Sequence, residues 1–191
     1  MGVLAKYESG EDKMRNILIG FILIFLDFNL KLGNSTIGLI PDFIGYIVMI
    51  RGLEEMIEES TLFMKIKPVV VGMAVYSGVL YFFDLVGIST SLGVLIYVLA
   101  LTSTAISLSI SYNIVMGVID MEGKYNILLN GNSLKFTWTI MLVLNIICFV
   151  LSLIPPTAIG IICIIATLVV SICFLVAFNN SKNLYYDTVI K

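Results

Sequence analysis

Six apolar runs, most of them close to twenty residues long, restrict the folding of this 191-residue chain more than any other feature of its sequence. A helix needs about 20 mostly apolar residues to cross the hydrocarbon core of a bilayer. Repetition of such runs predicts an all-α fold, a polytopic membrane bundle of six transmembrane helices. The second run is the shortest, and a re-entrant half-helix is its alternative. We expect the spans at about residues 16–32, 36–51, 68–87, 92–112, 136–154 and 157–178.

Composition indicates the same class of protein. Hydrophobic residues make up 59% of the chain and charged residues only 13%, whereas an ordinary soluble domain is about 25% charged. The mean hydropathy is +1.06. An exterior this apolar is compatible with lipid rather than water. We therefore expect the lipid bilayer to surround the chain, and a multi-pass protein of the cell membrane.

The basic residues are distributed unevenly between the two sides that six spans define. Cytoplasmic loops of membrane proteins are enriched in Lys and Arg, so the bias predicts an N-in and C-in topology with cytoplasmic tails at residues 1–15 and 179–191. A re-entrant second run would move Arg51, Lys65 and Lys67 to the outer side and weaken this bias. One side has Lys31 alone, and the other has Lys6, Lys13, Arg15, Arg51, Lys65, Lys67, Lys124, Lys135, Lys182 and Lys191.

Residues 52–66, between the second and third spans, have the pattern of an amphipathic cytoplasmic segment. Leu53, Met56, Ile57, Ser60 and Met64 fall on one helical face. A helix of this kind lies at the membrane interface. Its polar face is acidic, so it is expected to meet water or a basic membrane-protein partner rather than anionic lipid. The four candidate partner-binding residues are Glu54, Glu55, Glu58 and Glu59.

Polar side chains also collect toward the predicted outer side of the membrane. Charged groups at membrane depth cost at least about 2.5 kcal/mol each, so each one is expected to have a partner or a function. Asp27 and Lys31 are four residues apart, the favourable order for an ion pair on one helix. Three acids and one base together fit a small cation, a proton or an amine-bearing solute. The candidate ligand-binding residues are Asp27, Asn29, Lys31, Asp42, Tyr81 and Asp84.

A structural explanation of the same residues stays open. Asp27 can simply neutralise Lys31, and Asp42 after Pro41 can be the first turn of a helix whose dipole favours an acid. Asp84 can lie at the interface in water. Under this alternative the polar residues bind no solute.

Small and polar residues inside the spans are interpreted first as packing residues. Ser103, Ser107 and Ser111 form a small-residue ladder that lets helices approach closely, with a polar pathway as the alternative. The three cysteines, at positions 148, 163 and 173, lack CxxC spacing and are expected to behave as small core hydrophobes.

Several classes of function are excluded by what the sequence lacks. Histidine is absent, which removes the commonest proton shuttle and transition-metal ligand. There is no GxSxG, HExxH or P-loop motif, and no Gly-rich dinucleotide turn. With a net charge of −2, no basic field attracts nucleic acid. We therefore expect no enzyme activity, no cofactor, no metal site and no nucleic-acid partner.

The stretch Leu39-Ile-Pro-Asp-Phe-Ile-Gly-Tyr-Ile-Val-Met-Ile-Arg-Gly-Leu resembles small integral membrane proteins of Gram-positive bacteria. The resemblance covers about residues 15–68, rests on this one motif and implies no particular activity. In size and topology the chain is also similar to the substrate-binding components of energy-coupling-factor vitamin transporters. The Ala-rich coupling motif of their first helix is missing from residues 17–32.

Two functions from different classes follow from these patterns. The first is a small-solute or cation binding or transport component with a polar site in the outer half of the bundle. The second is a non-catalytic interaction protein, such as a sensor, an immunity factor or a complex subunit, that acts through the acidic face of residues 52–66.

Overall fold

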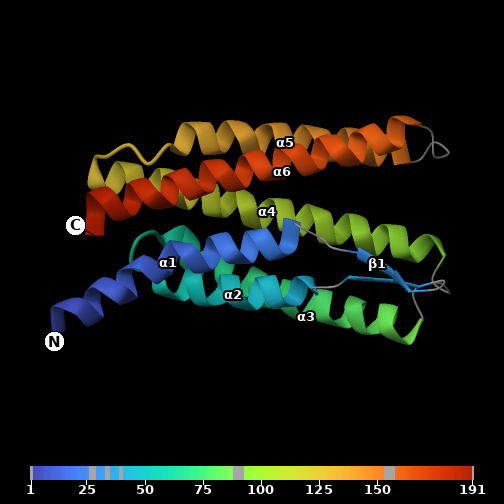
Figure 1. Cartoon of the computed structure of the whole chain (residues 1–191), viewed down its shortest axis with the longest axis horizontal. Coiled ribbons are helices and arrows are strands. Elements are labelled where there is room, and N and C mark those ends of the chain that lie inside the picture. The colour runs from blue at the N-terminus through green and yellow to red at the C-terminus, as the bar shows by residue number, and fades with distance from the viewer. Residues whose placement is uncertain are drawn as a thin grey trace. The chain divides into compact units, whose positions relative to one another are not determined.

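The computed structural model describes residues 2–25, 29–32, 35–38, 41–87, 93–152 and 158–190. The described chain is helical apart from one β-hairpin, and it divides into two compact units, Met1–Ile114 and Val115–Lys191. The elements are α1 (Gly2–Phe25), β1 (Asn29–Leu32), β2 (Ser35–Gly38), α2 (Asp42–Glu55), α3 (Thr61–Val86), α4 (Val94–Tyr125), α5 (Gly131–Ser152), α6 (Ala158–Tyr185) and the π-helical turn η2 (Tyr186–Ile190) (Figure 1).

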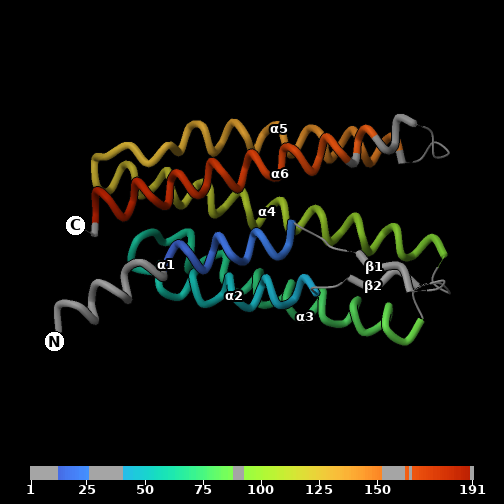
Figure 2. The backbone as a smooth tube through the Cα atoms, in the orientation of Figure 1, coloured from blue at the N-terminus to red at the C-terminus, as the bar shows by residue number. Residues whose placement is uncertain are grey.

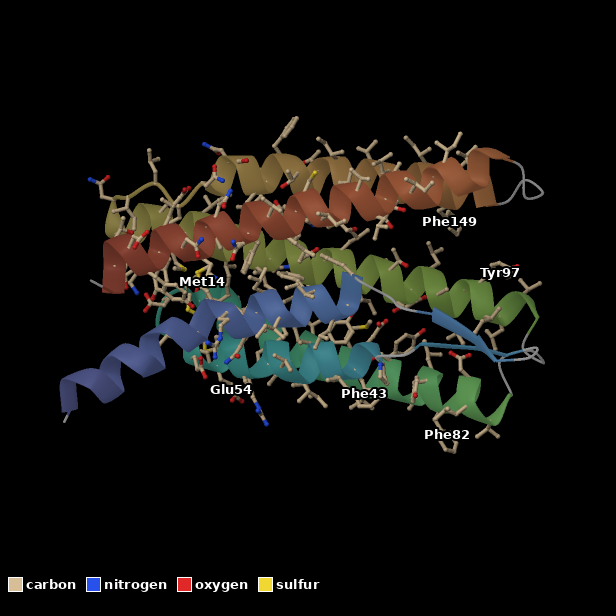
Figure 3. The ribbon with its side chains drawn as sticks, in the orientation of Figure 1. Met14, Phe43, Glu54, Phe82, Tyr97 and Phe149 are labelled. Atoms are coloured by element: carbon tan, nitrogen blue, oxygen red, sulfur yellow. The ribbon has the colours of Figure 1, made fainter. Side chains whose placement is uncertain are left out.

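Among the residues that the structure describes, four helices are long and apolar enough to cross a membrane, namely α3, α4, α5 and α6. Large apolar side chains on these helices are exposed, among them Phe82, Tyr97 and Phe149, which project away from the helix axes (Figure 3). Exposed apolar surface of this extent is typical of a protein whose solvent is lipid. The expectation of a membrane protein is therefore confirmed at the level of these four helices.

The first unit is built on the close approach of α1 and α2, which lie side by side (Figure 1). Glycines make this approach possible. A Cβ atom added at Gly45 would lie 2.9 Å from the carbonyl oxygen of Gly20, and one added at Gly20 would lie 2.8 Å from the carbonyl oxygen of Gly45. The helix backbones therefore touch, and around this contact the side chains of Ile17, Phe21 and Met49 are buried.

The connection between α2 and α3 is a tight, capped turn. Met56 ends α2 and is fully buried, and the hydroxyl of Ser60 caps α3 by accepting a hydrogen bond from the Leu62 backbone N–H at 3.2 Å. Residues 52–66 therefore form two helix ends and a turn, not the single interfacial helix that their pattern predicts. The predicted apolar face is buried at Leu53, Met56 and Ser60, whereas Met64 is exposed.

The β-hairpin replaces helix where the sequence predicts the ends of the first two spans. α1 ends at Phe25 rather than near residue 32, and α2 begins at Asp42 rather than near residue 36. β1 and β2 pair antiparallel, with Leu32 opposite Ser35. β2 also contacts α3, and α3 itself runs alongside α2 (Figure 2). The all-α prediction is thus confirmed for the helices and incomplete at this hairpin.

The second unit contains the end of α4 and the antiparallel pair α5 and α6. Its core is rich in aromatic rings, with Phe174 stacked on Phe178 at 6.5 Å between ring centroids and Tyr185 almost fully buried. The connection from α4 to α5 is organised by one carboxylate. An oxygen of Glu122 accepts hydrogen bonds from the backbone N–H groups of Leu129 and Gly131.

Candidate functional site

The candidate site lies at the hairpin end of the first unit, where α2 begins. Asp42 is the first residue of α2 and is partly buried. Pro41 precedes it as the N-cap residue in an extended conformation, and the Pro41 side chain makes no capping hydrogen bond. An acidic residue in the first turn is favoured by the partial positive charge of a helix N-terminus. The local sequence Pro-Asp therefore both starts the helix and places a carboxylate at its end.

The last turns of α3 lie beside the start of α2. Phe43, next to Asp42, meets Tyr81 edge to face with 5.9 Å between the ring centroids. Asp84 follows Tyr81 by three residues, so both lie on neighbouring positions of one face of α3. Tyr81 and Asp84 are both partly buried. The structure thus brings the Asp42 segment to Tyr81, one turn from Asp84.

The other predicted ligand-binding residues are only partly visible. The backbones of Asn29 and Lys31 belong to β1, whose partner β2 contacts α3. Asp27 and the side chains of Asn29 and Lys31 lie outside the described part of the structure. Because Lys31 is in a strand, the helical spacing that suggested an ion pair with Asp27 does not apply.

Tyr46 is a polar residue of this region that the sequence patterns did not single out. It is 2% exposed, one helical turn after Asp42, and its hydroxyl is hydrogen-bonded to the side chain of Ser107 on α4. Its position four residues after an acid was the available signal. Ser107 therefore joins two helices, whereas Ser111 donates to the carbonyl of Leu108 in its own helix. Ser111 is buried and Ser107 makes a polar contact beneath Asp42, while the close helix approach expected of the serine ladder stays a prediction.

The described side chains of this region supply a small set of polar groups. Among the residues that the structure describes, no three His, Cys, Asp or Glu side chains gather closely enough to hold a metal ion. Asp42, Tyr46 and Tyr81 offer one carboxylate and two hydroxyls. Such groups bind cations and donor-rich solutes through hydrogen bonds and charge.

The second predicted surface, the glutamates between α2 and α3, lies at the opposite end of α2. Glu54, Glu55 and Glu58 are exposed and Glu59 is partly so. Glu54 forms an ion pair with Lys67 of α3, with 2.8 Å between Oε1 and Nζ. Figure 3 shows Glu54 and Phe43 toward opposite ends of α2. Glu54 therefore already has a basic partner within the chain.

Comparison of the chain with known protein families, with curated proteins and with solved structures gives no match in any of the three. The resemblances noted from the Pro-Asp-Phe-Ile-Gly-Tyr motif and from the number of spans therefore stay predictions.

Proposed function

We propose that the chain is a six-span protein of the cell membrane that binds, and takes part in transporting, a small cationic or amine-bearing solute. The binding site is the hairpin end of the first unit, with Asp42, Tyr81 and Asp84 as its described residues. Asp27, Asn29 and Lys31 belong to the same proposed site.

The observation that carries this proposal is the interruption of the first two helices. Irregular backbone at membrane depth is tolerated only where protein buries it or where it lines a watery cavity. Transport proteins often place their binding sites at such breaks, where helix ends face the solute. The break between Phe25 and Asp42, with a β-hairpin in it, has this form.

Segment lengths are compatible with two crossings made of helix plus strand. Asn16–Phe25 reaches about 15 Å as a helix at roughly 1.5 Å per residue. Asn29–Leu32 adds about 13 Å as a strand at roughly 3.3 Å per residue. Their sum is close to the ~30 Å of the hydrocarbon core. Adding the lengths of β2 and α2 in the same way gives enough for a crossing back through the membrane. The hairpin therefore does not require a re-entrant topology.

The six-span topology has a direct test. In a variant with all three cysteines replaced by serine, single cysteines at Lys65, Lys124 and Ser89 report the side of the membrane on which each position lies. We expect an impermeant maleimide added to intact cells to label the Ser89→Cys variant only. Lys65→Cys and Lys124→Cys should react only after the membrane is opened. Labelling of Lys65→Cys in intact cells would overturn the topology, the orientation and the outward-facing site.

The solute site is tested by exchanging its carboxylate. Purified protein is screened by thermal shift against alkali cations, polyamines and amino acids, and co-purified small molecules are identified by mass spectrometry. We expect Asp42→Asn to weaken the binding of any solute found by about tenfold or more. Removing one charge of an enclosed charge pair costs at least about 1.4 kcal/mol of binding free energy, which corresponds to this factor. Asp84→Asn should have a smaller effect, because Asp84 is one turn from the Phe43–Tyr81 contact.

A matched variant separates the solute site from the acidic turn. Replacing Glu54, Glu55, Glu58 and Glu59 together by glutamine removes four charges at the other end of α2. We expect this variant to retain solute binding and uptake. Loss of cellular function through the glutamine variant alone, with Asp42→Asn fully active, would favour the interaction protein and refute the solute site.

A further inference from the structure

Two of the three cysteines occupy equivalent positions on the two arms of one helical hairpin. Cys148 is on α5 and Cys163 is on α6. Pro155 and Pro156 lie midway between them, separated from the cysteines by the equal stretches 149–154 and 157–162. In an antiparallel helical hairpin, residues equidistant from the turn lie at the same height. The sequence spacing alone therefore places the two cysteines on one level.

The structure places the two thiols near each other. α5 and α6 pack along each other (Figure 1), and Cys163 is the neighbouring group that acts on the Cys148 thiol. Both cysteines are partly exposed rather than sealed in a core. A disulfide requires neighbouring Cβ atoms and sulfur atoms that can meet without backbone movement. Neighbouring thiols at the same level of two packed helices fit this requirement.

We propose that Cys148 and Cys163 form a dithiol–disulfide pair, a redox modification site that covalently joins α5 to α6. The oxidant belongs to the class of small disulfides that enter lipid. One cysteine, as thiolate, attacks the oxidant and forms a mixed disulfide while releasing one thiol. The second cysteine attacks the mixed disulfide, forms the Cys148–Cys163 bond and releases a second thiol. Two electrons pass to the oxidant, and the two protons lost by the cysteines appear on the two released thiols.

Cys173 provides a matched comparison on the same helix. It follows Cys163 along α6 and is exposed. Since it is remote from the level of Cys148 along an antiparallel pair, it should not bond to Cys148. Exposure alone predicts that Cys173 reacts at least as readily as Cys163, whereas pairing predicts that only Cys163 becomes joined to Cys148. The two explanations therefore lead to different products.

The experiment uses the full chain in native membranes, treated with 4,4′-dithiodipyridine and then with N-ethylmaleimide. Peptides are identified by mass spectrometry without reduction. We expect a Cys148–Cys163 linked peptide in most molecules, with Cys173 left as a mixed disulfide with thiopyridone. The linked peptide should disappear on reduction, persist in Cys173→Ser and be absent in Cys163→Ser. The oxidised protein should also unfold at a higher temperature than the reduced protein.

Two results would overturn the inference. One is that Cys148 and Cys163 each carry thiopyridone and remain unlinked in the folded wild-type chain. The other is that Cys148 links to Cys173 as often as to Cys163. Both results come from the wild-type protein, so they stand even if a serine variant fails to fold. The inference does not depend on the proposed solute site, since the cysteines belong to the second unit and Asp42 to the first.

Discussion

Replacement of Gly45 by leucine is expected to separate α1 from α2 and to lower the free energy of unfolding by about 3 kcal/mol or more. Already a Cβ atom at this position would lie 2.9 Å from the Gly20 carbonyl oxygen and 2.7 Å from a side-chain carbon of Ile24. The carbonyl belongs to helix backbone and cannot turn aside. The helices must therefore move apart, and Ile17, Phe21 and Met49 lose contacts that now bury them.

The effect is measured as the thermal unfolding midpoint of purified protein in detergent, with the yield of monodisperse protein as a second readout. Gly72→Leu is the matched control, because it is the same substitution in a helix and a Cβ at Gly72 meets nothing within 4 Å. This control should unfold at the wild-type midpoint or slightly above it, since leucine favours helix over glycine. Equal midpoints for the two variants would show that α1 and α2 do not approach through their glycines.

The four long helices were predictable because hydrocarbon length and apolar run length are physically linked. These helices cover most of the four predicted spans, and α3, α4, α5 and α6 each extend beyond the predicted span at a polar end. A helix continues into water when its polar residues remain good helix formers and find caps, as at Ser60 before α3. Hydropathy predicts the apolar part of a helix and does not predict how far the helix continues beyond it.

The β-hairpin was missed because the prediction counted the apolar residues of this segment and did not consider the spacing at which they recur. From Leu26 to Leu32 apolar and polar residues alternate strictly, which is the strand period. Gly33-Asn34 is a two-residue link of the kind that joins hairpin strands. The prediction followed the length of the apolar run at residues 16–32, which is enough for a membrane span, instead of this strand-like alternation. The error changed the surroundings assigned to Lys31, which lies in a strand and not one helical turn from Asp27.

The candidate site was predictable in its residue types and only partly in its geometry. The structural explanation had Asp42 after Pro41 in the first turn of a helix, and α2 does begin at Asp42, although the predicted span began near residue 36. The meeting of Phe43 with Tyr81 depends on how α2 packs on α3, which the spacing within either helix cannot specify. Tyr46 escaped notice because a tyrosine within an apolar run is normally a packing residue, and its bond to Ser107 is a tertiary contact.

Glu122 was also overlooked, since an acid in a connection between spans normally faces water. Here one carboxylate oxygen accepts from the N–H groups of Leu129 at 2.7 Å and Gly131 at 2.9 Å. Leu129 is fully buried. Asn126 and Asn130 in the same connection have φ angles of 55° and 64°, a conformation that asparagine tolerates better than most residues. The carboxylate thus satisfies donors that the turned backbone leaves without helix partners, next to the N-terminus of α5.

Glu122→Ala is therefore expected to destabilise the second unit by about 2–3 kcal/mol, because it leaves two backbone donors unsatisfied where water has limited access. Glu122→Gln keeps an acceptor oxygen and should cost about 1 kcal/mol. The measurement is the rate of trypsin cleavage at Lys124 and Lys135, together with the unfolding midpoint. We expect faster cleavage in Glu122→Ala, intermediate cleavage in Glu122→Gln and no change in Gly123→Ala, where an added Cβ meets nothing within 4 Å. Cleavage at the wild-type rate in Glu122→Ala would mean that the connection holds its shape without the carboxylate, and that the start of α5 depends on the packing of its apolar face instead.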